Sequence, residues 1–118
     1  MITRDNKIIS QGYNGFPEQI KSIVEDKVDR ETKYQYVVHA EVNTLINAEV
    51  SIRDCSIYVH GLPICTSCAS ILIRAGIKRV VMSGSNFFLK SETSDFWLNQ
   101  NKVSQLMFHE SKIDVIIL

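Results

Sequence analysis

The chain has 118 residues, 45% hydrophobic and 22% charged, so we predict a single domain over residues 1–118 with one sizeable core. The 13 Lys and Arg residues balance 13 Asp and Glu residues, and this neutral charge gives no electrostatic footprint for polymeric nucleic acid. No apolar run is long enough to span a membrane and no signal-peptide pattern opens the chain, so we expect a cytoplasmic protein without membrane partners.

The first third of the chain contains one predicted strand and a long polar segment. Residues 7–13 are rich in β-forming residues and lead into Asn14-Gly15-Phe16-Pro17, which is a turn signal. Residues 18–36 are polar and charged, which indicates an irregular loop with a short helix around residues 29–36.

The middle of the chain predicts two helices with a strand between them. The aliphatic residues from His39 to Ala48 follow helical spacing, whereas residues 55–61 alternate and end in a glycine, as strands often do. Residues 66–75 form the second predicted helix. Gly76 follows it directly, at the position where a left-handed residue commonly ends a helix.

The last third adds two strands and a longer helix. We predict strands over residues 77–84 and 113–118 and a helix over residues 95–110, where apolar residues recur. Strands that alternate with helices of this length indicate an α/β fold with a largely covered sheet.

Two of the three cysteines, Cys65 and Cys68, form a Cys-x-x-Cys pair at the start of a predicted helix. The helix dipole and the unpaired amides at that position favour the thiolate, which is the form that binds metals. Three cysteines are too few for a disulfide framework. By itself the pair is compatible with zinc binding, with redox chemistry and with two buried thiols.

His39 and Glu41 give the cysteine pair possible partners. A catalytic zinc takes three protein ligands and keeps a fourth position open for water, and His39, Cys65 and Cys68 supply three ligands of the right type. Glu41 stands two residues from a ligand, so its carboxylate can lie beside the metal and move the proton of an activated water. His-x-Glu followed by Cys-x-x-Cys is the signature of zinc-dependent nucleobase deaminases.

A purely structural interpretation is the alternative. His39 and Glu41 would then be ordinary polar residues of a helix N-terminus, and the cysteines would belong to a closed zinc site. Such a site needs a fourth ligand, for which the nitrogen and sulfur candidates are Cys55, His60 and His109. His60 lies between a strand and the cysteine loop, so it is also a candidate for contact with a substrate.

Four segments of the chain carry a family resemblance: GYNGFP at 12–17, DRETKY at 29–34, VVHAEVN at 37–43 and GLPICTSCASILIRAGIKRVV at 61–81. In their order and spacing they resemble the cytidine and deoxycytidylate deaminase superfamily, and more narrowly the deoxycytidylate (dCMP) deaminases. The resemblance implies a three-layer α/β/α sandwich around a mixed sheet of about five strands.

The resemblance also assigns roles to individual residues. It implies that the histidine and the two cysteines named above bind zinc, and that Glu41 is the proton shuttle. Asn14 resembles the family asparagine that bonds the sugar, and the backbone of Ala40 would contact the pyrimidine edge. The implied reaction is the hydrolysis of dCMP to dUMP and ammonia by a zinc-activated water. Residues 16–38 contain no Cys or His, so we expect one zinc per chain.

The chain also departs from the family pattern. Ile64 stands where the family usually has proline, and Glu18-Gln19 stands where it tends to have Arg-Gly. The family opens with a helix and a full first strand, so we expect this chain to lack that N-terminal helix and most of that strand. A homo-oligomer would then cover the sheet face left exposed.

Several functions therefore stay open. The first is dCMP deaminase; the others are a deaminase of another cytosine nucleoside or nucleotide or of a tRNA base, and a catalytically inactive zinc-binding regulatory subunit. The residues that would meet a substrate phosphate are undecided among Lys7, Arg30, Lys33 and Arg74.

Overall fold

Five strands form one mixed sheet in a computed structural model, which describes residues 1–24, 28–84 and 95–118. The strand order across the sheet is β2-β1-β3-β4-β5. β1 pairs antiparallel with β2 and with β3, whereas β3, β4 and β5 run parallel. The strands are β1 (Ile2–Arg4), β2 (Lys7–Ser10), β3 (Ser56–His60), β4 (Arg79–Ser83) and β5 (Asp114–Ile117).

The short strand β1 is an element that the sequence analysis did not predict. Asp5 and Asn6 connect it to β2, with φ angles of 52° and 63°. Two successive positive φ angles are typical of the tight hairpin turn whose twist matches that of the flanking strands. An Asp-Asn pair between two β-forming segments was therefore the available signal. Ile2 is fully buried, so this strand contributes directly to the core.

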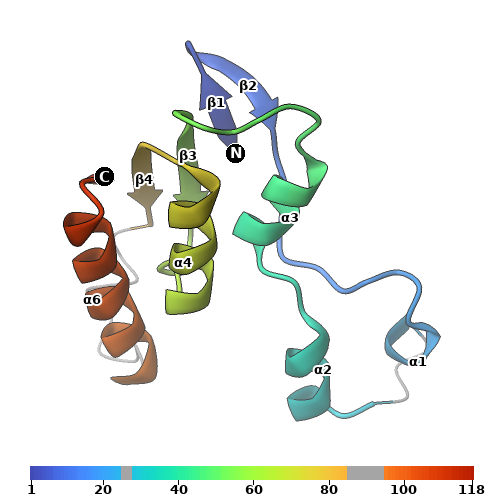
Figure 1. The fold of residues 1–118 in the computed structure, drawn as a ribbon. Coiled ribbons are helices and arrows are strands. Elements are labelled where there is room, and N and C mark those ends of the chain that lie inside the picture. Colours follow the sequence, from blue (N-terminus) through green and yellow to red (C-terminus); the bar gives the residue numbers. More distant parts are fainter. Residues whose placement is uncertain (25–27, 85–94) are drawn as a thin grey trace.

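Three helices form a layer on the sheet. α3, α4 and α6 lie next to one another in front of it, whereas α1 and α2 lie to one side (Figure 1). The predicted helices over 29–36, 39–48, 66–75 and 95–110 are present, and α1 was not predicted. The helices are α1 (Lys21–Val24), α2 (Arg30–Tyr36), α3 (Ala40–Asn47), α4 (Thr66–Ala75) and α6 (Asp95–Glu110).

Local capping explains where α2 begins and where α4 ends. The side chain of Asp29 accepts a hydrogen bond from the backbone N–H of Thr32 at 2.7 Å, so it caps the N-terminus of α2. Gly76 follows α4 with φ 90°, and its N–H bonds the carbonyl groups of the last turn. This left-handed position favours glycine, as the sequence predicted.

The two faces of the sheet differ in what covers them. Ile57 and Val80, neighbours in the register of β3 and β4, belong to the buried core together with Leu72 of α4. On the other face Tyr58 is 38% exposed and Ile116 is 41% exposed. The predicted α/β fold with a mixed five-stranded sheet is confirmed. The helical layer that the resemblance adds on the second face is not provided by α3, α4 or α6.

Among the helices of the described residues, none combines the length and the apolar character that a membrane crossing requires.

Candidate metal centre

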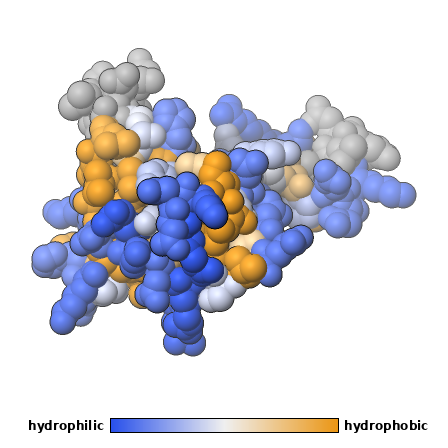
Figure 2. All heavy atoms as spheres, turned by 90° about the horizontal axis from the view of Figure 1, so that it is seen from above, coloured by the Kyte–Doolittle hydropathy of each residue, from blue (hydrophilic) through white to orange (hydrophobic). Residues whose placement is uncertain are grey.

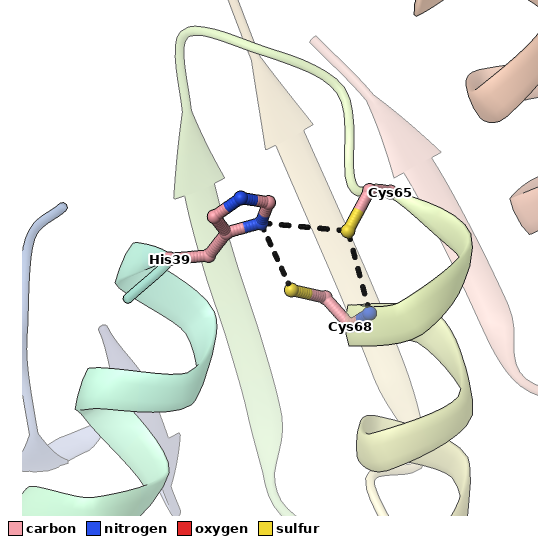
Figure 3. Close-up of side chains that lie close together, drawn as sticks. All are labelled: His39, Cys65 and Cys68. Carbon is pink, nitrogen blue, oxygen red and sulfur yellow. Dashed lines mark hydrogen bonds between the residues drawn. The ribbon is translucent and has the colours of Figure 1, made fainter. Parts of the chain in front are cut away.

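His39 is the residue from which helix α3 starts. Its backbone is extended, with φ −65° and ψ 151°, and its side chain makes no capping hydrogen bond to the helix. The imidazole instead faces the start of α4, where its Nδ1 lies 3.4 Å from Sγ of Cys65 and 3.4 Å from Sγ of Cys68. Figure 3 shows the three side chains converging from the N-termini of two helices.

The spacing of these three donor atoms fits a tetrahedral zinc ion. Zn–S and Zn–N bonds of about 2.3 and 2.0–2.1 Å, at a tetrahedral angle, place nitrogen and sulfur about 3.6 Å apart. The two observed N···S distances, both 3.4 Å, are close to this edge length. Among the described residues, His39, Cys65 and Cys68 are the group whose donor atoms all lie within 4.8 Å of one another.

The candidates for a fourth ligand lie outside this cluster. Cys55 is fully buried and its Sγ contacts the carbonyl of Arg53, while the Nδ1 of His60 pairs with Oγ of Ser83 at 2.8 Å. Neither residue belongs to the group of converging ligand atoms, nor does His109. Within the described residues the centre therefore offers three protein ligands, the number that a catalytic zinc site uses.

Hydrogen bonding between the two thiols separates their acidities. The side chain and the backbone N–H of Cys68 donate to the sulfur of Cys65 and, together with His39, lower the pKa of Cys65 to about 5. The pKa of Cys68 is raised, because its thiol gives that hydrogen bond and is buried. The hydrogen bond thus favours the thiolate at Cys65, and a cation bound by both sulfurs would displace the proton between them.

Glu41 lies in the first turn of α3, beside the cluster and at the edge of a cleft. Its side chain is only 7% exposed. Burial raises the pKa of Glu41 above its ordinary value, against the lowering effects of its own backbone N–H and of His39. A carboxyl group that holds its proton more readily than a solvated one is suited to accept a proton and return it during a reaction.

The cleft beside Glu41 is large enough for a small molecule. It has a volume of about 660 Å³, within the range of small-molecule sites. His39, Glu41, Asn14 and Ala40 all line it. The structure thus brings the two residues expected to contact the substrate to the same cavity as the proposed ligand and the proposed proton shuttle.

Asn14 and Ala40 are hydrogen-bonded to each other. Oδ1 of Asn14 accepts the backbone N–H of Ala40 at 2.7 Å, so Asn14 satisfies one of the amides that a helix N-terminus leaves unpaired. The carbonyl of Ala40 accepts the hydroxyl of Thr44 at 2.7 Å. The capping role of Asn14 was not foreseen, because its partner lies 26 residues further along the chain.

Residues 10–15 lie along α3 and are hydrogen-bonded to it and to the residue before His39, through contacts that the sequence analysis did not predict. Gly15 and Val38, the residue before His39, exchange two backbone hydrogen bonds of 3.1 and 2.8 Å. Side chains add three more: Ser10 Oγ to Thr44 O at 2.6 Å, Asn43 Nδ2 to Tyr13 O at 2.9 Å and Asn47 Nδ2 to Gln11 O at 3.0 Å. These contacts fix the start of α3, and with it the backbone of His39.

Other polar residues line the same cleft. His60 and Ser83 end the paired strands β3 and β4, and both line the cavity. Of the four cationic residues considered for phosphate binding, Arg30 is linked to the rim, because its Nε donates at 2.6 Å to the hydroxyl of Tyr34, a lining residue.

Comparison with known proteins agrees with this geometry. Residues 1–84 match the family model of the cytidine and deoxycytidylate deaminase zinc-binding region. The "Uncharacterized deaminase in luxG 3'region" of Aliivibrio fischeri is 34% identical over 118 residues, covering 98% of this chain and 74% of that protein. The deoxycytidylate deaminase of Mus musculus is 36% identical over 102 residues, covering 80% of this chain and 56% of that protein. The chain thus spans about half the length of the mouse relative.

Solved structures show the same fold. The dCMP deaminase from the cyanophage S-TIM5, in complex with dCMP and dUMP, superimposes with a TM-score of 0.67 at 19% identity, covering 99% of this chain and 77% of that chain. The apo form of the same enzyme gives a TM-score of 0.62 at 20% identity, with 99% and 76% coverage. The family match over residues 1–84, together with these relatives, establishes that the chain belongs to the cytidine and deoxycytidylate deaminase family.

Proposed function

We propose that the chain is a zinc-dependent enzyme that hydrolyses dCMP to dUMP and ammonia, with one zinc per chain held by His39, Cys65 and Cys68. The observation that carries the proposal is the convergence of one nitrogen and two sulfur atoms, with N···S distances of 3.4 Å, beside the buried carboxyl group of Glu41. Deoxycytidylate deaminases among the relatives support dCMP as the substrate.

Glu41 is the residue that moves protons in this proposal. Bound zinc would supply Lewis-acid activation of a water near neutral pH. Glu41 would take one proton from the attacking water and deliver it to N3 of the cytosine ring while the water oxygen forms a bond to C4. Glu41 would then take the remaining proton of that oxygen and pass it to the amino group, so that the C4–N bond breaks, ammonia leaves and a carbonyl remains at C4. The raised pKa of Glu41 helps it to hold a proton between these two transfers.

Asn14 can serve the site and a substrate with different atoms. Its Oδ1 is engaged by Ala40, and within the described residues its Nδ2 makes no hydrogen bond, so this donor is available to the sugar. The contact between the backbone of Ala40 and the pyrimidine edge stays a prediction. Its N–H is given to Asn14 and its carbonyl already accepts the hydroxyl of Thr44.

Replacement of Glu41 by glutamine tests the proposal. Glu41→Gln keeps nearly the same shape but cannot take up the proton, so kcat for dCMP should fall about 10²–10⁴-fold. Ammonia release from dCMP, CMP, deoxycytidine and cytidine is measured side by side, and zinc content is measured on the same samples. A variant that retains zinc and stays within tenfold of the wild-type rate would remove Glu41 from the mechanism. Equal kcat/KM for dCMP and deoxycytidine would show that the enzyme does not require the phosphate and acts on nucleosides.

Association of two or more copies stays a prediction, as do the single domain over residues 1–118 and the cytoplasmic location. Apolar side chains gather in two areas of one face in Figure 2. At the edge of the sheet, Ile117 of β5 is 47% exposed and the following Leu118 is 66% exposed. Exposed apolar groups at a strand edge favour pairing with another chain, which light scattering on dilute protein would detect.

A further inference from the structure

The cysteine loop is held on both sides of Cys65 by one helix. Oγ of Ser104 donates to the carbonyl of Ile64, the residue before Cys65, at 2.8 Å. Oε1 of Gln100 accepts the backbone N–H of Thr66, the residue after Cys65, at 2.9 Å, and also its hydroxyl at 3.0 Å. Both side chains belong to α6, more than 30 residues along the chain from the loop that they bind.

These hydrogen bonds satisfy backbone groups that have few other options. Ile64 and Ser104 are each 1% exposed. Loss of the serine hydroxyl would therefore take this hydrogen bond from a carbonyl group in a buried residue, which is costly. The N–H of Thr66 is one of the amides that the first turn of α4 leaves unpaired. The sulfur of Cys65 already accepts the N–H of Cys68 at 3.4 Å. Gln100 therefore accepts the N–H of Thr66, which the sulfur of Cys65 does not bond.

The spacing on α6 makes the two contacts act as a unit. Gln100 and Ser104 are four residues apart, so they lie one turn apart on the same side of the helix. Phe108, a further turn along, is fully buried in the core. A helix anchored in this way has little freedom to slide, and it fixes the backbone before and after Cys65 together.

We propose that α6 is a positioning element of the metal centre, and that Gln100 and Ser104 hold the backbone around Cys65 so that its sulfur stands at bonding distance before a metal arrives. The inference rests on the proposed zinc site. α6 lies beyond residues 1–84, which match the zinc-binding region of the family, so its part in the centre is a feature of the tertiary structure. Partners that orient a metal ligand affect metal affinity without touching the metal.

The test measures zinc binding rather than turnover. Gln100→Leu removes the acceptor, and Ser104→Ala removes the donor. Each should weaken zinc binding about 10–100-fold in competition with a chromophoric chelator, with the far-UV circular dichroism unchanged. Gln100→Glu should restore most of the affinity, since both contacts with Thr66 use the side chain only as an acceptor. The visible absorption of the Co²⁺-substituted protein reports ligand geometry, and it should change in Gln100→Leu and return in Gln100→Glu.

A neighbouring glutamine provides the matched control. Nε2 of Gln105 donates to Oδ1 of Asn101 at 3.2 Å within α6, and among the described residues this side chain makes no hydrogen bond to the cysteine loop, so Gln105→Leu should bind zinc as the wild type does. If Ser104→Ala fails to fold because its site is buried, the comparison of Gln100→Leu with Gln100→Glu decides the question alone.

Two different failures are distinguishable. Folded Gln100→Leu with zinc affinity within twofold of wild type and an unchanged Co²⁺ spectrum would overturn the role of α6 while leaving the zinc site intact. A wild-type protein that binds no zinc would overturn the metal centre itself, and with it the positioning role.

Discussion

Two differently built supports bring the side chains of the candidate metal centre together. The histidine arm consists of residues 10–15 and α3, and it ends at His39. The cysteine arm consists of residues 64–68 and α6. Both hold the backbone on either side of a ligand: Gly15 and Asn14 bond the neighbours of His39, while Ser104 and Gln100 bond the neighbours of Cys65. The ligands themselves are thus left free for a metal.

The two arms differ in the type of contact. The cysteine arm is held by side-chain hydrogen bonds from α6, of which that of Ser104 is buried and those of Gln100 are partly buried. The histidine arm adds backbone hydrogen bonds, and its side-chain contacts extend from the buried pair of Ser10 and Thr44 to the exposed Asn14, which lines the cleft. The histidine arm thus reaches the cleft, where Asn14 can serve the substrate as well.

Removal of a ligand from either arm should have the largest effect on metal binding, because a catalytic zinc site needs all three of its protein ligands. Cys68→Ser and His39→Ala should each reduce bound zinc from one per chain to a small fraction, measured by elemental analysis of protein purified without added metal. A chelator should lower the Tm of the wild type but not of these variants, because bound metal stabilises the folded state.

Cys55 provides the control for this prediction. Its thiol lies outside the cluster, so Cys55→Ala should keep its zinc. Near-stoichiometric zinc in both Cys65→Ser and Cys68→Ser would show that the metal is bound elsewhere.

A methyl group at Gly12 should loosen the histidine arm alone. A Cβ atom there would lie 2.8 Å from the backbone nitrogen of Thr44 and 2.9 Å from its hydroxyl, so α3 would have to shift. We expect Gly12→Ala to lower the free energy of unfolding by about 1–3 kcal/mol, measured by urea denaturation.

Gly15→Ala is the matched control, since among the described residues its added Cβ would meet the ring of Tyr13 alone, at 4.0 Å. Its stability should stay within about 0.5 kcal/mol of wild type. Equal effects of the two substitutions would mean that the close approach of Gly12 to α3 does not constrain the arm.

Two substitutions of Asn14 should distinguish its capping of α3 from its contact with the substrate. We expect these substitutions to have the smallest effects. Asn14→Asp keeps the oxygen that accepts the N–H of Ala40 and adds a charge that the helix N-terminus favours, but it loses the Nδ2 donor. It should keep wild-type stability while its KM for dCMP rises about 2–10-fold. Asn14→Ala should show the same rise in KM and also lose about 0.5–2 kcal/mol of stability. An unchanged KM in Asn14→Asp would leave Asn14 with a capping role only.

The sequence by itself determined the features that depend on near neighbours. The bounds predicted for α4 and α6 agree with the structure, because apolar spacing within a helix and the left-handed glycine after α4 are local signals. The candidate ligands were also predicted from the sequence, since the His-x-Glu and Cys-x-x-Cys motifs are each complete within three or four residues. Two features near the N-terminus, β1 and α1, were missed because each is only three or four residues long.

The tertiary structure alone decided which residues support those ligands. Asn14 meets Ala40 across 26 residues, and Gln100 and Ser104 meet the cysteine loop across 34 and 40 residues. A lone Asn, Gln or Ser carries no periodicity or spacing that identifies a distant partner, and in the unfolded chain its hydrogen-bonding groups are satisfied equally well by water. Only the packing of α3 and α6 beside α4 turns these three ordinary polar residues into supports of one metal centre.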